Sequence, residues 1–495
     1  MNFENIVTSS LTQLLITFQS AHREADLFEI VPLLELGKIE DWDGTELKKR
    51  EEKIRELVII LGGKCIAILL EKLSECYEAQ ARALEQTKGW WRKRTGKNGS
   101  RKRTILTMGN VKVTLNFPYV VERLPKPRKK KKPPLQGFCP FLRWLGLEKR
   151  VTPLVWSKIA EYGTMSHSFE TARLTLKDWG IDVNIRRIQS LTYSFCKAAL
   201  SQRKLKIFHL KQGDLEKKKI LKDKRVVISA DGGRTRLIEY KGRKRNQKTN
   251  RRPYKGEWRE PKLLTIYAVD EKGKKIKTGE VPITNDGTFE DSKGFLVILE
   301  MYLVELGINQ AKEVLFIADG SDWMWKDVPP LLEKLGCDKS KTYYLQDFYH
   351  VTEHLSSFAQ AAFNKDNEKK AWFKQACSQL KRGHAKHLLK EMIAFKKDEK
   401  LDKKALEKEI NHLVKLQEAG RINYPLIAEK KLPLGSGAIE SLIRQAVNLR
   451  LKGNGKFWRR YNAEALLHAR CQWLAGRWSE LVDSILTARI YPAIE

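Results

Sequence analysis

Three acidic residues stand where carboxylates can act together. Asp231 and Asp319 each follow a short apolar run, and each is followed directly by glycine. Such runs predict buried strands, and groups that bind ligands gather at strand ends in α/β sheets. Glu440 comes just after a Gly-Ser-Gly sequence, where we expect a helix to begin. The sequence therefore predicts two carboxylates on strand ends and a third on the first turn of a nearby helix.

Three carboxylates in this arrangement can hold a pair of hard divalent cations. Two such ions activate a water or a 3′-hydroxyl and stabilise the leaving oxygen in phosphoryl transfer. Taken singly, each acid has a plainer explanation. A strand-end aspartate before glycine is more often an ordinary turn, and any acid in this chain can pair with one of its many Lys and Arg residues. The pattern becomes specific only in combination.

The elements that would position these acids alternate between strand and helix. Buried strands are predicted at 226–230, 263–269, 314–318 and 342–345, with a helix at 295–306. This alternation favours an α/β fold with a partly parallel sheet. Residues 350–430 and 438–490 show helical periodicity, as do residues 1–88.

The chain between residues 89 and 222 is strongly basic. A Gly109-Asn110 pair separates two β-prone runs, which predicts a hairpin, and the prolines and lysines of 125–134 predict an exposed linker. Ser168 to Gln189 has the pattern of a helix, a glycine turn and a second helix, which suggests helix-turn-helix. Two packed helices without DNA contact explain this last segment equally well.

The net charge points to a polyanionic partner. Lys and Arg outnumber Asp and Glu by 94 to 60, giving +34, which indicates nucleic acid ahead of an anionic membrane surface. The segment 241–259 is rich in Lys and Arg and could grip a DNA backbone, although a solvated loop is the plainer alternative. The candidate DNA-binding residues are Arg101, Lys102, Arg103, Arg186, Arg187, Lys241, Arg243, Lys244, Arg245, Lys248, Arg251, Arg252, Trp258, Arg259 and Lys452.

Several classes of protein are disfavoured. The seven cysteines are scattered without CxxC spacing, which argues against a disulfide framework or a cysteine zinc site and fits a reducing compartment. The first residues lack the pattern of a signal peptide, and the most apolar stretch, 57–70, is too short to span a bilayer. The sequence contains no GxxxxGK[ST] motif, so it gives no sign of ATP use. No serine or tyrosine recombinase signature is visible.

Five stretches together resemble the DDE transposases of bacterial insertion sequences. They are Ala318-Asp-Gly-Ser-Asp-Trp-Met-Trp325 with Leu345-Gln-Asp-Phe-Tyr-His-Val-Thr-Glu-His-Leu355, Leu432-Pro-Leu-Gly-Ser-Gly-Ala-Ile-Glu-Ser441 with Asn448-Leu-Arg-Leu-Lys-Gly453, and Arg251–Tyr267. The sequence is most similar to the ISKra group, with ISLre relatives next, near the Mutator-like assemblage. The resemblance covers roughly residues 225–480 and, more loosely, 104–119.

The resemblance implies an RNase H-like catalytic core interrupted by an all-helical insertion, with a mainly helical N-terminal DNA-binding region. Asp231, Asp319 and Glu440 match the catalytic, metal-binding triad. Asp347-Phe-Tyr-His350 matches a signature expected to support the site, although a packed histidine at a helix start explains His350 as well. Asp322 adds a fourth acid nearby, and a triad that uses Asp347 is an alternative.

The resemblance also implies a domain order. We expect an N-terminal helical region (1–88), a basic hairpin and linker (89–135), a helical region with the possible helix-turn-helix (136–222), a catalytic core (223–349 and 433–495) and a helical insertion (350–432). The 121 positions from Asp319 to Glu440 far exceed what a βα connection needs, which fits the insertion.

The activity implied is binding of element ends, followed by metal-dependent strand cleavage and strand transfer. Two Mg²⁺ ions, replaceable by Mn²⁺, would serve as cofactors, with double-stranded DNA of the ends and target as partner. A homodimer or higher oligomer on paired ends, in the cytoplasm at the bacterial nucleoid, is expected, with no membrane and no nucleotide cofactor. The alternatives are an inactive transposase-derived DNA-binding protein, an RNase H-like nuclease and a regulator built on the helix-turn-helix.

Overall fold

The computed structural model describes residue 40 and residues 42–86, 95–122, 137–250, 252–276, 281–397 and 401–488. The chain divides into two compact units, one of residues 1–192 with 486–495 and one of residues 193–485, and the boundary falls within helix α9 (Ile185–Gln212). The five segments predicted from the sequence are finer than this division and stay a prediction. The predicted linker at 125–134 lies outside the described residues, as do the basic residues 92–94.

The first unit contains the predicted basic hairpin. Strands β1 (Thr95–Leu106) and β2 (Lys112–Glu122) pair antiparallel, and Gly109 and Asn110 turn the chain with φ of 64° and 57°. Asparagine and glycine tolerate this left-handed backbone, so the Gly-Asn signal is confirmed. The other elements of the unit are α4 (Gly44–Glu75), α5 (Tyr77–Gln86), β3 (Gly137–Phe138), α6 (Pro140–Trp144), α7 (Pro153–Met165) and α8 (Phe169–Lys177).

Helix α4 lies against the turn of this hairpin. A Cβ on Gly63 would stand 2.1 Å from the carbonyl oxygen of Met108, so only glycine permits the approach. Thr107 at the same turn donates its hydroxyl to the carbonyl of Gly63 at 3.0 Å. Close backbone packing therefore fixes the hairpin on the helix.

Helices α8 and α9 follow the predicted helix-turn-helix pattern. The chain turns at Gly180, with φ of 62°, and the Asn184 side chain accepts the backbone N–H of Arg187 at 2.9 Å, which caps the start of α9. Arg186 is exposed, whereas Arg187 is half-buried and donates to the carbonyl of Lys149 at 3.2 Å. Arg187 thus has an internal structural contact, and DNA contact by this segment stays a prediction.

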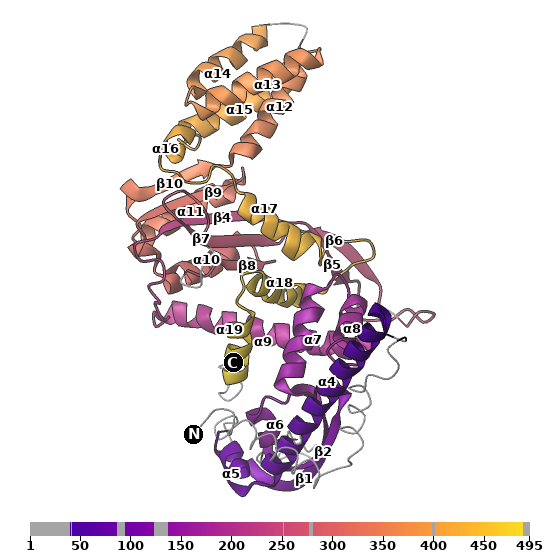
Figure 1. The fold of residues 1–495 in the computed structure, drawn as a ribbon. Helices are drawn as coiled ribbons and strands as arrows, with labels where there is room; N and C mark the ends of the chain where they lie inside the picture. Colours follow the sequence, from indigo (N-terminus) through magenta and orange to yellow (C-terminus); the bar gives the residue numbers. More distant parts are fainter. Residues whose placement is uncertain are drawn as a thin grey trace. The chain divides into compact units, whose positions relative to one another are not determined.

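A five-stranded mixed sheet forms the centre of the second unit (Figure 1). Its strands lie in the order β10 (Thr342–Gln346), β9 (Glu313–Ala318), β4 (Arg225–Gly232), β7 (Lys262–Val269) and β8 (Thr284–Thr288). β4 pairs parallel with β9, and β9 with β10, while β4, β7 and β8 pair antiparallel. All four predicted strands are present, and the α/β class is confirmed as a mixed α/β unit.

Both faces of the sheet are covered, which explains why its strands are continuous apolar runs. On one face, alternate residues such as Val226 and Phe316 pack against α10 (Ser292–Leu306) and α11 (Asp322–Lys334). On the other, Val227 and Leu315 join a second core. That core is completed by α12 (Phe348–Ala362), α13 (Asp366–Lys381), α14 (Ala385–Ala394), α15 (Lys403–Glu418) and α16 (Tyr424–Glu429).

The chain returns from these helices through α17 (Gly437–Ile443), a π-helical turn (Arg444–Asn448), α18 (Arg460–Leu474) and α19 (Trp478–Ala488). α18 lies against β8 through a buried polar network. Asp286 accepts from the guanidinium of Arg203 at 3.0 Å, from the hydroxyl of Tyr302 at 2.9 Å and from the ring of His468 at 2.9 Å. Burial alone would raise the pKa of Asp286, but the charges of Arg203 and His468 hold it well below its ordinary value.

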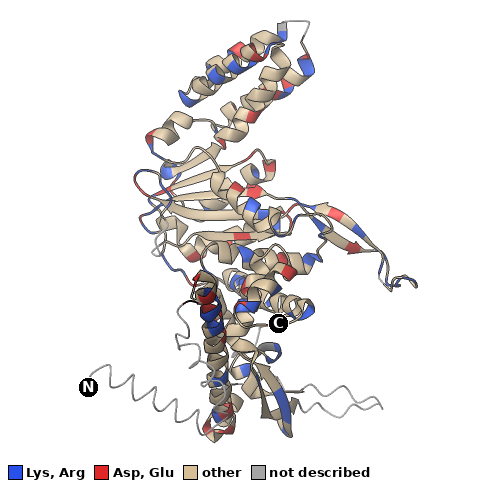
Figure 2. Ribbon diagram, turned by 45° about the vertical axis from the view of Figure 1, so that its right-hand side comes forward, with Lys and Arg blue, Asp and Glu red and all other residues tan. Residues whose placement is uncertain are grey.

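A two-stranded ribbon, β5 (Thr235–Tyr240) with β6 (Tyr254–Arg259), leaves the sheet next to Asp231. We predicted a basic loop for 241–259, and this was wrong for 254–259, which form a strand. In the described residues, the loop proper is 241–250 and 252–253. Figure 2 shows this ribbon extending from the sheet with Lys and Arg along it. Within the described residues, no helix is both long and apolar enough to cross a bilayer.

Candidate active site

Strand register brings Asp231 and Asp319 together. β4 and β9 are parallel neighbours with Ala230 opposite Ala318, so the two aspartates follow at equivalent positions. Alternation places them on the same face, because successive side chains point to opposite sides of a strand. The neighbouring position of the two predicted acids is therefore a direct result of the sheet pairing.

The pair carries unneutralised charge. Burial first, and then the charge of Asp319, raise the pKa of Asp231 from 3.8 to about 7. Glu440 adds to the increase, whereas a hydrogen bond of 2.5 Å from the backbone N–H of Gly232 opposes it. Within the described residues no Lys or Arg forms an ion pair with Asp231, Asp319 or Glu440. In a chain with +34 net charge, this leaves a local excess of negative charge suited to a cation.

Glu440 lies on the first turn of α17, as predicted, and its side chain is exposed. The Ser436 hydroxyl lies 3.5 Å from its carboxylate. Its charge reaches Asp231, but it does not line the pocket that contains the two aspartates. Among the residues the structure describes, no group of three or more His, Cys, Asp or Glu side chains is placed to hold a metal ion. The structure brings two of the three predicted ligands together and leaves the third close by.

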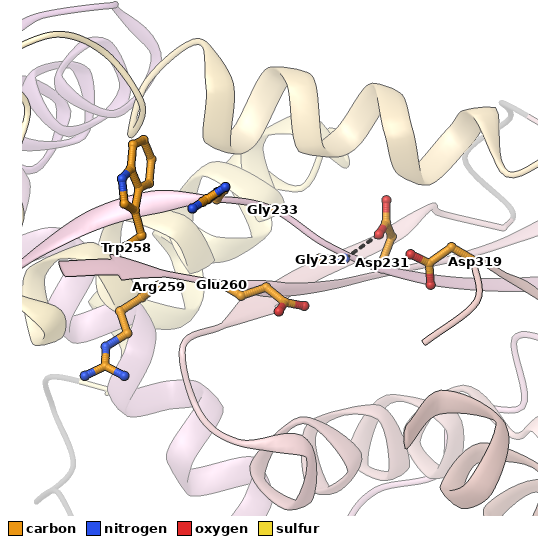
Figure 3. A pocket seen from close by; sticks show the side chains of 8 residues that line it. Asp231, Gly232, Gly233, Trp258, Arg259, Glu260 and Asp319 are labelled. Atoms are coloured by element: carbon orange, nitrogen blue, oxygen red, sulfur yellow. Dashed lines mark hydrogen bonds between the residues drawn. The ribbon is translucent and has the colours of Figure 1, made fainter. Parts of the chain in front are cut away.

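The pocket has a volume of about 400 Å³ and an acidic and a basic side. Figure 3 shows Asp231 and Asp319 side by side at one end and Trp258 at the other, with Glu260 between them. Arg234 and Arg259 complete the lining together with Gly232 and Gly233. Sequence reasoning missed Arg234 and Glu260. Arg234 directly precedes β5, and Glu260 directly follows β6.

Asp347 holds together the backbone segments next to the site. It is buried, and its carboxylate accepts the backbone N–H of His350 at 2.9 Å and the backbone N–H of Ser436. These two bonds occupy the carboxylate, which disfavours a metal triad built on Asp347. Asp322 is exposed on the first turn of α11.

His350 faces the turn after Asp319. A Cβ on Gly320 would lie 3.7 Å from Nε2 of His350 and 3.7 Å from the amide nitrogen of Gln346. The Gln346 amide is fully buried and has no hydrogen-bond partner, and the same holds for Nε2 of the half-buried His412. Gln346 and His412 were not anticipated, because no sequence motif marks them.

The basic residues predicted around the ribbon are exposed. Lys241, Arg243, Lys244, Arg245, Lys248 and Arg252 lie on the loop that joins β5 to β6, Lys452 is exposed after the π-helical turn, and Arg251 is outside the described residues. Arg259 is engaged by Glu239 at 2.8 Å and by Glu257 at 2.7 Å, so its charge is already paired. Trp458, which follows Lys452 along the chain, is 7% exposed and belongs to a buried core.

In the first unit, the predicted basic triplet lies on β1. Arg101 and Lys102 are exposed and Arg103 is half-buried, and the guanidinium of Arg101 stacks over the ring of Tyr119 at 5.0 Å. Arg101 and Lys102 are therefore accessible to DNA, and DNA contact by this triplet stays a prediction.

No protein-family model matches the chain, and no curated protein matches it. Among solved structures, the chain is similar to the Drosophila P element transposase strand transfer complex. The match covers 68% of this chain and 82% of that chain, at 12% sequence identity and a TM-score of 0.22. At this TM-score the similarity carries no argument about the activity of this chain.

Proposed function

We propose that the chain is a DDE transposase, related to those of the ISKra group, that cuts and joins DNA. The observation that carries this proposal is the convergence of Asp231 and Asp319 on adjacent parallel strands, unneutralised by any basic side chain in the described residues. Burial, and then the charge of Asp319 with no counter-ion beside it, raise the pKa of Asp231 to about 7, as expected for a site that binds a cation.

The sheet supports the proposal of an RNase H-like core. In chain order its strands are β4, β7, β8, β9 and β10, with the first three antiparallel and the last two added in parallel beside β4. Helices α12–α16 between β10 and α17 support the proposed insertion at 350–432.

The donor set fits Mg²⁺, because carboxylate oxygens are the ligands that hard cations take. We propose that Asp231, Asp319 and Glu440 hold the ions, with Glu440 turning inward from its exposed position on α17. Bound Mg²⁺ would supply Lewis-acid activation of a water or 3′-hydroxyl and neutralise the leaving oxygen. Asp347 fixes the turn at Ser436 that precedes α17, and Arg234 offers a cation for the DNA backbone at the same pocket.

The test is a cleavage assay on a labelled duplex that carries the element's own end, with Mg²⁺, with Mn²⁺ and with EDTA. We expect a nick at the end that requires metal and disappears in Glu440→Gln, with DNA binding retained. Tight binding without cleavage under either metal would refute the enzymatic proposal in favour of a transposase-derived DNA-binding protein. Assembly as a homodimer or higher oligomer on paired ends, and action at the nucleoid, stay predictions of the resemblance.

A further inference from the structure

The β5–β6 ribbon has two chemically different faces. Residues paired across a ribbon share a face, so one face carries the pairs Arg236–Trp258 and Tyr240–Tyr254. The other carries Glu239, Glu257, Arg259 and Lys255, whose charges pair with one another at 2.7–2.9 Å. We call the first the aromatic face.

Trp258 is the residue of the aromatic face that reaches the candidate active site. Its side chain is 42% exposed, so part of its surface is open to a ligand. It lines the same pocket as Asp231 and Asp319, and the guanidinium of Arg234 lies 4.9 Å from its ring centroid. Arg236 lies 4.5 Å from the same ring.

These two arginines are available to an external anion. Carboxylates pair with Arg259 and Lys255 on the other face, but none pairs with Arg234 or Arg236 in the described part of the chain. The flat face of each guanidinium contacts the ring of Trp258 in a cation–π interaction. The N–H groups at the guanidinium edges are left to donate hydrogen bonds to a bound anion. A flat aromatic ring beside unpaired guanidinium groups matches a nucleobase joined to its phosphate.

We propose that Trp258 and Arg234 bind one unpaired nucleotide of the DNA strand next to the phosphodiester to be cut, with the base stacked on Trp258 and its phosphate held by Arg234. The inference rests on the proposed function, because it takes Asp231 and Asp319 to mark the scissile phosphate.

The size and geometry of the pocket favour an unpaired nucleotide over intact duplex. Its volume of about 400 Å³ lies at the lower end of the range for small-molecule sites, which leaves room for one nucleotide. A base within a duplex has both faces covered by its neighbours, so it can stack on Trp258 only after leaving the helix. Figure 3 places Trp258 at the end of the pocket opposite the acidic pair, so that base and reacting phosphate can be bound together.

The experiment compares a fully paired duplex with a forked duplex that carries one unpaired 2-aminopurine at the fork, in EDTA. Stacking quenches the fluorescence of 2-aminopurine, and anisotropy gives affinity for both DNAs. Base stacking on an aromatic side chain is worth roughly a tenfold change in affinity. We therefore expect about a tenfold preference for the fork, with quenching, in the wild-type protein.

Four variants separate stacking from structure. Trp258→Ala and Trp258→Leu should abolish both the preference and the quenching, whereas Trp258→Phe should retain most of each. The control is Tyr461→Ala, because Tyr461 is also exposed, at 46%, and also has lysines over its ring, yet does not line the pocket. This control should keep the preference.

The proposal is overturned if the wild type shows no preference for the fork, if Trp258→Leu retains quenching, or if Tyr461→Ala loses as much as Trp258→Ala. Because the assay runs in EDTA, it does not depend on catalysis. Fork preference through Trp258 without metal-dependent nicking would support the nucleotide site and count against the proposed enzyme.

Discussion

Replacing Asp231 with asparagine should stabilise the metal-free protein. The pKa of Asp231 rises from 3.8 to about 7 because of burial and then the charge of Asp319. The folded protein therefore binds this proton more tightly than the unfolded chain does. Stability supplied by the protonated carboxyl is lost as pH rises from about 3.8 through about 7, and above that range the ionised group opposes folding.

The size of the effect follows from the two pKa values. One pKa unit corresponds to about 1.4 kcal/mol, so the ionised Asp231 costs up to ~4 kcal/mol at a pH near 8. The cost falls to ~2 kcal/mol near pH 5 and to below ~1 kcal/mol near pH 4. Asparagine has the shape of the protonated carboxyl without the charge, so Asp231→Asn should gain about these amounts.

The assay is urea unfolding in EDTA at the three pH values. The control is Asp483→Asn, an exposed acid on α19, which should change stability by no more than about 0.5 kcal/mol at any pH. Adding Mg²⁺ should narrow the gap between Asp231→Asn and wild type, because a cation stabilises the ionised pair. If Asp231→Asn is no more stable than wild type at pH 8, or if its advantage is the same at pH 4, the charge-repulsion argument is refuted.

Three further predictions concern the stability of variants at other residues. Asp286→Ala removes the shared acceptor of a buried arginine, tyrosine and histidine, and urea unfolding should show a loss of about 3–5 kcal/mol. Gly63→Ala places a methyl group 2.1 Å from the Met108 carbonyl oxygen and should lower the free energy of unfolding by about 1–3 kcal/mol. The control, Gly62→Ala, meets only the flexible Met108 side chain at 3.4 Å and should be tolerated. A similar melting temperature for both variants would contradict this. Burial, and then neighbouring histidines, lower the pKa of His412 from 6.5 to about 4, so the folded state should lose stability as pH falls from about 6.5 to about 4, and His412→Phe should flatten that dependence in thermal melts.

The sequence revealed the parts of the fold that are buried on both faces. β4, β7 and β9 are continuous apolar runs, which is the pattern expected of strands that are covered on both faces, so each can be recognised from its own residues. β8 was missed because its sequence, Thr-Asn-Asp-Gly-Thr, has no strand pattern of its own. It is held by pairing with β7 and by the buried network around Asp286, neither of which can be seen locally.

The ribbon was missed for a different reason. β6 is exposed along nearly all of its length, and its alternation is between aromatic or glycine residues and ionic ones rather than between apolar and polar ones. β5 buries only Thr235 and Leu237, which is too short an alternation to stand out in the sequence. The same limit applies to the site. Asp231 and Asp319 were visible because each ends a recognisable strand, whereas Arg234 belongs to the site only through the path of the ribbon.

The segment from α12 to α16 leaves and rejoins the sheet at a single point. The backbone N–H of Phe348 donates to the carbonyl of Leu434 at 3.0 Å, and the carboxylate of Asp347 accepts from Ser436, so the first and last residues of the excursion are tied to each other. A segment closed in this way can grow or shrink without moving the strands on either side of its base. Residues near the end of the segment also bond the sheet, since the carbonyl of Arg421 accepts the backbone N–H of Gln346 at 2.8 Å, so a change in length is accommodated in the helices before that contact.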